Sequence, residues 1–259
     1  MSLNLEPILA HAPAFILVLT RLSGLLLFIP LLSASMVPTQ VKVMLTLALG
    51  AAVYPAVGPP AVPLSADLYD LAPLMGGEIL IGASIGILAT VPLVTAQLAG
   101  LIMGQQMGLG LAQVFNPSVD IEGDNIGQIL FFAAMSAFLV AGGLEMLYQS
   151  LVHTFSIVPL GAFRARSAPL ELLTGLVGAG FSVALRVSMP VLLILALENL
   201  ATGFISKTVP SLNIMVFGFP VRVLLGLVIV MLGVGAMLGA LMSGITEDMA
   251  RIESWVWSL

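Results

Sequence analysis

The sequence predicts an all-α integral membrane protein, a single membrane domain with about six apolar segments. Hydrophobic residues make up 59% of the chain and charged residues only 8%, whereas soluble domains average roughly 25% charged residues. Several uninterrupted apolar runs reach the length of about 20 residues that a membrane-crossing helix needs. The predicted segments are residues 7–32, 43–57, 71–104, 126–158, 170–206 and 220–245.

The first two predicted segments differ in length. The first, residues 7–32, is long enough to cross a bilayer and contains Arg21 as its interior charge. Its N-terminal flank lacks the basic region of a cleaved signal peptide, so we expect this segment to stay in the mature protein. Pro38 and Lys42 indicate a loop before the second segment, residues 43–57, which is short for a helix that needs about 20 residues to cross.

The third predicted segment, residues 71–104, has Glu78 near its start and Pro92 in its middle. It is long enough to cross the bilayer obliquely, and a proline inside a helix usually kinks it. Gly82 and Gly86 have the small-xxx-small spacing that allows two helices to approach closely. We therefore expect a long, kinked helix.

The central stretch, residues 104–124, points most directly to function. Glycine recurs in it, which disfavours a stable helix, and its Asn-Pro pair ends any helix that remains. Glycine-rich, non-helical backbone is tolerated beside membrane helices only where protein or a water-filled cavity surrounds it. We therefore predict a loop that lines or closes a pore. Its assigned residues are Gly104, Gln105, Gln106, Met107, Gly108, Leu109, Gly110, Leu111, Val114, Phe115, Asn116 and Pro117.

Glycines and prolines divide the second half of the chain. Gly142 and Gly143 interrupt the fourth segment, which leaves either one bent segment or two helices. The fifth segment contains Pro190, and a break around Pro210 separates it from the sixth. The predicted helix breaks are Pro38, Pro92, Pro190, Pro210 and Pro220.

Ionisable residues inside these segments are candidates for a functional or an assembly role. Charge inside a bilayer is costly, so such residues usually face a cavity or find partners. Two interpretations stay open: a proton or ion relay, and pairing between helices or subunits, which the scattered positions of the acids favour. Arg186 and Glu198 are too far apart to pair along one straight helix. The assigned residues are Arg21, Lys42, Glu78, Arg186 and Glu198, with Glu145 as a further candidate.

The sequence offers little support for an enzyme. It has no cysteine, and its two histidines, His11 and His153, are far apart, so we predict no metal site and no cofactor. No Ser/His/Asp set, carboxylate pair or phosphate-binding loop is visible. No basic patch indicates a nucleic acid partner. We expect His153 to hydrogen-bond a neighbouring helix, although its side chain could titrate near neutral pH.

Three stretches resemble a known family. The FliR family of flagellar biosynthesis and type III secretion export-gate proteins (SctT-like) has an N-terminal signature similar to RLSGLLLFIPLLSASMVPTQVKVMLTLAL, residues 21–49. Its glycine-rich stretch before an Asn/Asp-Pro pair is similar to GQQMGLGLAQVFNPSVD. Its C-terminal stretch resembles PSLNIMVFGFPVRVLLGL. The three occur in the right order and cover nearly the whole chain, although Leu144 stands where the family often has histidine after two glycines.

The resemblance implies a non-enzymatic export-gate subunit built from kinked helical hairpins. It implies a FliP-like part at residues 1–160 and a FliQ-like part at residues 161–259. The implied partners are FliP-like, FliQ-like and FlhB-like subunits around a channel for unfolded substrate proteins, in the bacterial inner membrane at the flagellar basal body. The implied role of the loop at residues 104–117 is to plug the closed channel.

One alternative belongs to a different class. A secondary transporter or small-molecule channel would suit broken helices at Pro92 and Pro190 together with buried Glu78 and Glu198. The sequence shows no sharp internal repeat and no polar cluster at mid-membrane, and both count against that alternative.

Overall fold

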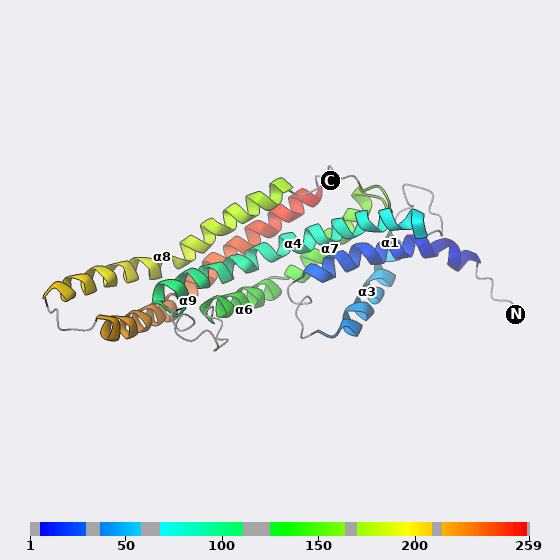
Figure 1. The fold of residues 1–259 in the computed structure, drawn as a ribbon. Helices are drawn as coiled ribbons and strands as arrows, with labels where there is room; N and C mark the ends of the chain where they lie inside the picture. Colours follow the sequence, from blue (N-terminus) through cyan, green and yellow to red (C-terminus); the bar gives the residue numbers. More distant parts are fainter. Residues whose placement is uncertain are drawn as a thin grey trace. The chain divides into compact units, whose positions relative to one another are not determined.

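The structure, a computed structural model of the 259-residue chain, describes residues 6–29, 37–57, 68–110, 125–163, 170–208 and 214–257. Every regular element within these ranges is a helix, so the predicted all-α fold is confirmed (Figure 1). The elements are α1 (Glu6–Phe28), α3 (Thr39–Val53), the 3-10 turn η1 (Tyr54–Ala56), α4 (Leu68–Met107), α6 (Asn125–Val140), α7 (Gly143–Ile157), α8 (Leu170–Thr208) and α9 (Ile214–Trp257).

Not all of the six predicted segments become candidates for crossing a membrane. Four helices, α1, α4, α8 and α9, are long and apolar enough, and the broken pair α6 and α7 makes a fifth candidate. Helix α3 has only 15 residues, in keeping with the shortness of its segment. The fourth segment is two helices, because Gly142 between α6 and α7 takes a left-handed conformation with φ of 77°.

The described chain forms two compact units assembled from interleaved segments. Unit 1 comprises residues 1–91, 142–176 and 248–259, and unit 2 comprises residues 92–141 and 177–247. Helices α4, α8 and α9 therefore each contribute residues to both units. The predicted division at residue 160 describes likeness to two other subunits rather than compactness, so it stays a prediction.

Unit 1 is organised around a close contact between α1 and α4. A Cβ atom at Gly82 of α4 would overlap the carbonyl oxygen of Arg21 in α1, and one at Gly24 of α1 would overlap that of Ile79 in α4. Because these neighbours are backbone atoms, the helices could accept a larger side chain only by moving apart. The small-residue spacing that starts at Gly82 thus marks a helix contact, as its pattern predicts.

We expect Gly82→Ala to destabilise the protein, because its methyl group would force α1 away from α4. The expected loss is about 1–3 kcal/mol, as for other overpacked sites. Gly76→Ala is the matched control on the same helix, since a Cβ there meets no atom within 4 Å; alanine should be neutral or stabilising at that position. Thermal unfolding in detergent, with the chain purified together with its implied partner subunits, measures both effects. Equal unfolding temperatures for the two variants would contradict the prediction.

Unit 2 joins the second part of α4 to α6, α8 and α9. A Cβ at Gly100 of α4 would overlap backbone atoms of Gly127 in α6, which shows how closely these two helices approach. Met107, the last residue of α4, has no exposed surface and lies against Gly226 of α9. Close packing that involves glycine therefore fixes this part of α4 at its middle and at its C-terminal end.

The prolines do not interrupt the helices as predicted. Pro92 lies within the continuous helix α4, and Pro190 and Pro220 lie inside α8 and α9, so the breaks expected at these three positions are wrong. The kink expected at Pro92 stays a prediction. Membrane helices tolerate proline because neighbouring groups and local adjustments satisfy the freed carbonyl. Pro38 does mark a boundary, since it immediately precedes α3. Pro210 lies outside the described residues.

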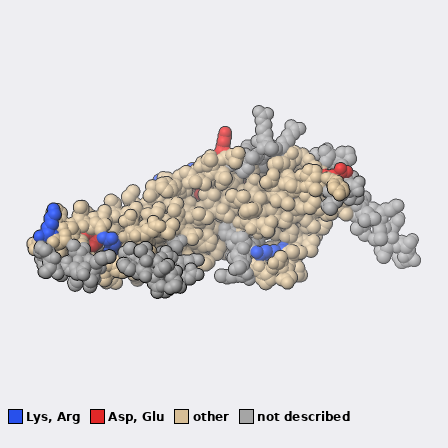
Figure 2. Space-filling model, in the orientation of Figure 1, with Lys and Arg blue, Asp and Glu red and all other residues tan. Residues whose placement is uncertain are grey.

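Much of the apolar surface of α8 and α9 is exposed in the isolated chain. Leu197 of α8 is 64% exposed and Leu232 of α9 is 83% exposed. Figure 2 shows few charged residues on the face that it draws. Apolar surface of this extent is normally covered by lipid or by another protein.

Candidate functional site

The glycine-rich central stretch begins one helical turn later than predicted. Gly104 to Met107 form the last turn of α4 rather than a loop, with Gln105 and Gln106 exposed and Gly104 and Met107 buried. Only residues 108–110 of the predicted loop lie beyond the helix within the described part of the chain. The remaining assigned residues, Leu111, Val114, Phe115, Asn116 and Pro117, lie outside it.

Gly108 is the residue that ends α4. Its φ is 82°, and its backbone N–H donates to the carbonyl of Gln105 over 3.0 Å. The N–H of Leu109 donates to the carbonyl of Gly104 over 3.1 Å. These two bonds form a Schellman motif, in which a glycine in the left-handed conformation closes the helix. The loop therefore starts at a defined helix end, the C-terminus of α4, and the contact of Met107 with Gly226 holds that end in place.

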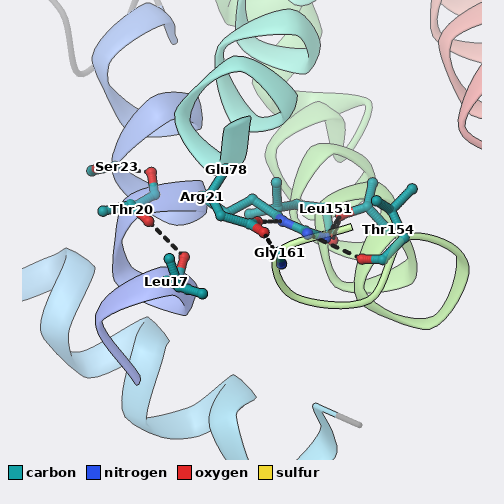
Figure 3. Close-up of polar contacts among 9 residues, drawn as sticks. Leu17, Thr20, Arg21, Ser23, Glu78, Leu151, Thr154 and Gly161 are labelled. Atoms are coloured by element: carbon teal, nitrogen blue, oxygen red, sulfur yellow. Dashed lines mark hydrogen bonds and ion pairs between the residues drawn. The ribbon is translucent and has the colours of Figure 1, made fainter. Parts of the chain in front are cut away.

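A buried polar cluster lies in unit 1 and is centred on Arg21 (Figure 3). Its Nε donates to Glu78 of α4 in an ion pair whose two side chains are both 0% exposed. Its terminal nitrogens donate to the Thr154 hydroxyl and to the Val158 carbonyl, each over 3.0 Å. The other carboxylate oxygen of Glu78 accepts the backbone N–H of Gly161 over 2.9 Å.

The cluster links segments that are distant in sequence. Arg21 belongs to α1, Glu78 to α4 and Thr154 to α7, while Gly161 lies in the turn that follows α7. The guanidinium carbon of Arg21 also lies 4.2 Å from the centre of the Phe155 ring, a favourable cation–π distance. Because both charged groups are paired and hydrogen-bonded, the arrangement suits a structural clamp better than a proton relay.

A second ion pair connects α8 and α9 in unit 2. Nε of Arg222 lies 3.1 Å from a carboxylate oxygen of Glu198, and another Arg222 nitrogen donates to Asn199. The other oxygen of Glu198 accepts the hydroxyl of Thr202 over 2.7 Å. Arg222 was not among the predicted polar residues. Its position at the start of the sixth apolar segment could have indicated a pairing with the acid Glu198 in the preceding segment.

Three other predicted ionisable residues are not buried in the isolated chain. Arg186 is exposed, and no hydrogen bond or ion pair joins it to any residue that the structure describes. Glu145 is exposed and accepts a hydrogen bond from Gln149. Lys42 is half-buried in the first turn of α3. Arg186 and Glu145 are therefore exposed in the isolated chain, and their roles in assembly stay predictions.

His153 makes a ring contact rather than the expected hydrogen bond to another helix. Its ring centre lies 3.8 Å from that of Trp257 at the end of α9, and both residues belong to unit 1. Its Nε2 is buried without a hydrogen-bond partner among the described residues. These rings line a pocket of about 390 Å³ together with Gln149 and Glu253. Within the described ranges no group of residues could hold a metal ion.

Comparison with known proteins matches this chain to a family over most of its length. The profile of the bacterial export proteins, family 1, matches residues 12–248. The flagellar biosynthetic protein FliR of Escherichia coli (strain K12) is similar, with 30% identity over 209 residues, 81% of this chain and 79% of that protein. FliR of Bacillus subtilis (strain 168) is 27% identical over 215 residues, 82% of each chain.

A protein that is named for translocation is also similar. The Yop proteins translocation protein T of Yersinia pestis is 27% identical over 172 residues, which cover 66% of each chain. The resemblance of the three sequence stretches to the FliR family is therefore confirmed. The chain belongs to the family of bacterial export proteins, family 1.

Proposed function

We propose that this protein is a non-enzymatic core subunit of the export gate of a bacterial flagellum or a related type III secretion system. The family match carries the proposal, because it extends from α1 into α9. Similar proteins are named for flagellar biosynthesis and for Yop translocation, so the proposal covers both kinds of machine. In this role the chain forms part of the channel by which unfolded substrate proteins cross the cytoplasmic membrane.

The proposed partners are FliP-like and FliQ-like subunits, joined by a FlhB-like subunit. Support comes from the surface of the chain, since only 11% of the membrane-crossing stretch of α9 is buried within it. The corresponding share is 61% for α4. An apolar helix with so little of its surface buried within the chain needs lipid or other subunits around it. Helices α8 and α9 are therefore the proposed sites of contact with neighbouring subunits.

The proposed gating element is the central stretch after α4. Its first residues are positioned by the helix cap at Gly108 and by Met107 against Gly226. The sequence that follows is rich in apolar side chains and reaches an Asn-Pro pair. A loop of this composition, held at a rigid base, can exclude water and ions and still move aside for a polypeptide, because local opening costs less than separating packed helices.

The experiment that tests the gate assignment is the mass of the native complex. We expect co-production with the FliP-like, FliQ-like and FlhB-like subunits, and purification in mild detergent, to give one large hetero-oligomer. Produced alone, the chain should be unstable or aggregated, because its apolar faces are uncovered and the described part of the chain offers Arg186 no partner. A stable, monodisperse monomer or homodimer that transports a small molecule in liposomes would instead establish the transporter alternative.

A further inference from the structure

Arg186 occupies an unusual position on α8. It is the one charged residue between Glu171 and Glu198, so an uncharged stretch lies on either side of it along the helix. At about 1.5 Å per residue, those acids lie roughly 22 and 18 Å away along the axis. Glu198 is moreover engaged by Arg222. Neither carboxylate of α8 itself can therefore neutralise Arg186.

The surface around Arg186 is apolar. Met189 and Leu193 are each about half exposed, and they lie three and seven positions after Arg186, on the same uncovered side of α8. Ser182, one turn before Arg186, is exposed as well. A charged group thus lies within a surface that is otherwise suited to lipid or to an apolar helix.

Neither lipid nor water is a favourable environment for both the charge and the apolar side chains of this surface. Helix α8 is a candidate for crossing a membrane, and an arginine near the middle of such a helix is costly in lipid. Water would satisfy the guanidinium of Arg186 but would leave the apolar side chains of Met189 and Leu193 exposed to it. A protein helix with an apolar face and one carboxylate satisfies both, because a guanidinium can bind a carboxylate through two parallel hydrogen bonds.

We propose that Arg186 is the docking point for an apolar helix of another subunit, which places an Asp or Glu carboxylate against the guanidinium. This inference rests on the proposed function, because it needs a neighbouring subunit in the membrane. A second copy of this chain is a poorer occupant. The carboxylates of Glu78 and Glu198 are buried in their own ion pairs, and Glu145, an exposed acid, lies in the first turn of α7 rather than within an apolar helix interior.

The first test measures how much complex assembles when Arg186 is changed. We expect Arg186→Leu and Arg186→Glu to lower the fraction of assembled complex at least about tenfold, since the partner's carboxylate would be buried without a counter-charge. Arg186→Lys should retain part of the assembly, because lysine keeps the charge but loses the paired geometry. Lys207→Leu is the matched control, a second exposed cation near the end of the same helix, and it should assemble normally.

The second test identifies the occupant. A photoreactive residue at position 186 should crosslink a different subunit, and exchanging the nearby acid of that subunit for arginine should restore assembly to Arg186→Glu. Assembly of Arg186→Leu at the level of the unchanged protein would overturn the proposal. If Arg186→Leu loses bound anionic lipid but assembles normally, the partner of Arg186 is a lipid phosphate group and the proposal is overturned.

Two further outcomes separate this proposal from others. A crosslink between two copies of this chain, with Glu145→Gln as harmful as Arg186→Leu, would replace the partner helix by a second copy. If the unchanged chain forms no hetero-oligomer at all, the proposed function fails, and the docking proposal fails with it. If the unchanged chain assembles and Arg186→Leu assembles equally well, only the docking proposal fails.

Discussion

Deleting residues 109–115 is expected to give a complex that assembles but leaks ions. The deletion leaves Met107 on Gly226 and keeps the glycine that ends α4, so the packing of unit 2 is retained. It removes the apolar side chains of Leu109, Leu111 and the residues up to position 115, which we propose exclude water and ions. The measurement is ion conductance in vesicles that contain the purified complex, supported by growth sensitivity of cells to small solutes.

A replacement variant tests whether the apolar side chains or the length of the loop prevent leakage. Exchanging residues 109–115 for seven glycine and serine residues keeps the connection but removes the apolar bulk, so this variant should leak as well. A deletion variant that assembles and stays as impermeable as the intact complex would remove the plug assignment. Failure of both variants to assemble would show that the stretch packs against other subunits.

Removing Glu78 is expected to cause the largest loss of stability of any single substitution in unit 1. Glu78→Ala leaves Arg21 charged and fully buried without its counter-ion, and such a loss typically amounts to about 3–5 kcal/mol. It also leaves the backbone N–H of Gly161 without its acceptor. The unfolding temperature of the purified complex in detergent and the yield of assembled complex should both fall.

Two comparisons make this prediction specific to the buried pair. The double substitution Arg21→Leu with Glu78→Leu should recover much of the loss, because no unpaired charge remains in the core. Glu198→Ala should have a smaller effect, since its partner Arg222 is 33% exposed and can be solvated. If Glu78→Ala folds and assembles normally but export no longer depends on the proton motive force, Glu78 is a relay and the clamp interpretation is wrong.

The class of the fold and the family could both be predicted from the sequence alone. Apolar composition and run length are local properties, and a bilayer leaves a long apolar run few conformations besides the helix, so the helical segments could be predicted one by one. The shortness of the α3 segment and the break at Gly142 were visible for the same reason. Three short stretches in the right order were enough to indicate the family.

The start of the central loop was less predictable. Glycine at positions 104 and 108 suggested a loop from Gly104 onward, but Gly104 remains helical and only Gly108 takes the left-handed conformation that ends α4. A glycine can serve either in a close helix contact or at a helix end, and its identity does not distinguish the two. Packing decided between them, because Met107 is buried against Gly226 and keeps the last turn helical.

Which charges are paired could not be predicted from the sequence and depends on how the helices pack. Arg21 meets Glu78 from 57 positions away, and Glu198 meets Arg222 across the α8–α9 connection. Arg186 makes no ion pair or hydrogen bond with any described residue. The free-energy cost of burying a charged side chain follows from its type. Its partner depends on which helices pack together and in what register. That packing is set by contacts between residues far apart in the sequence.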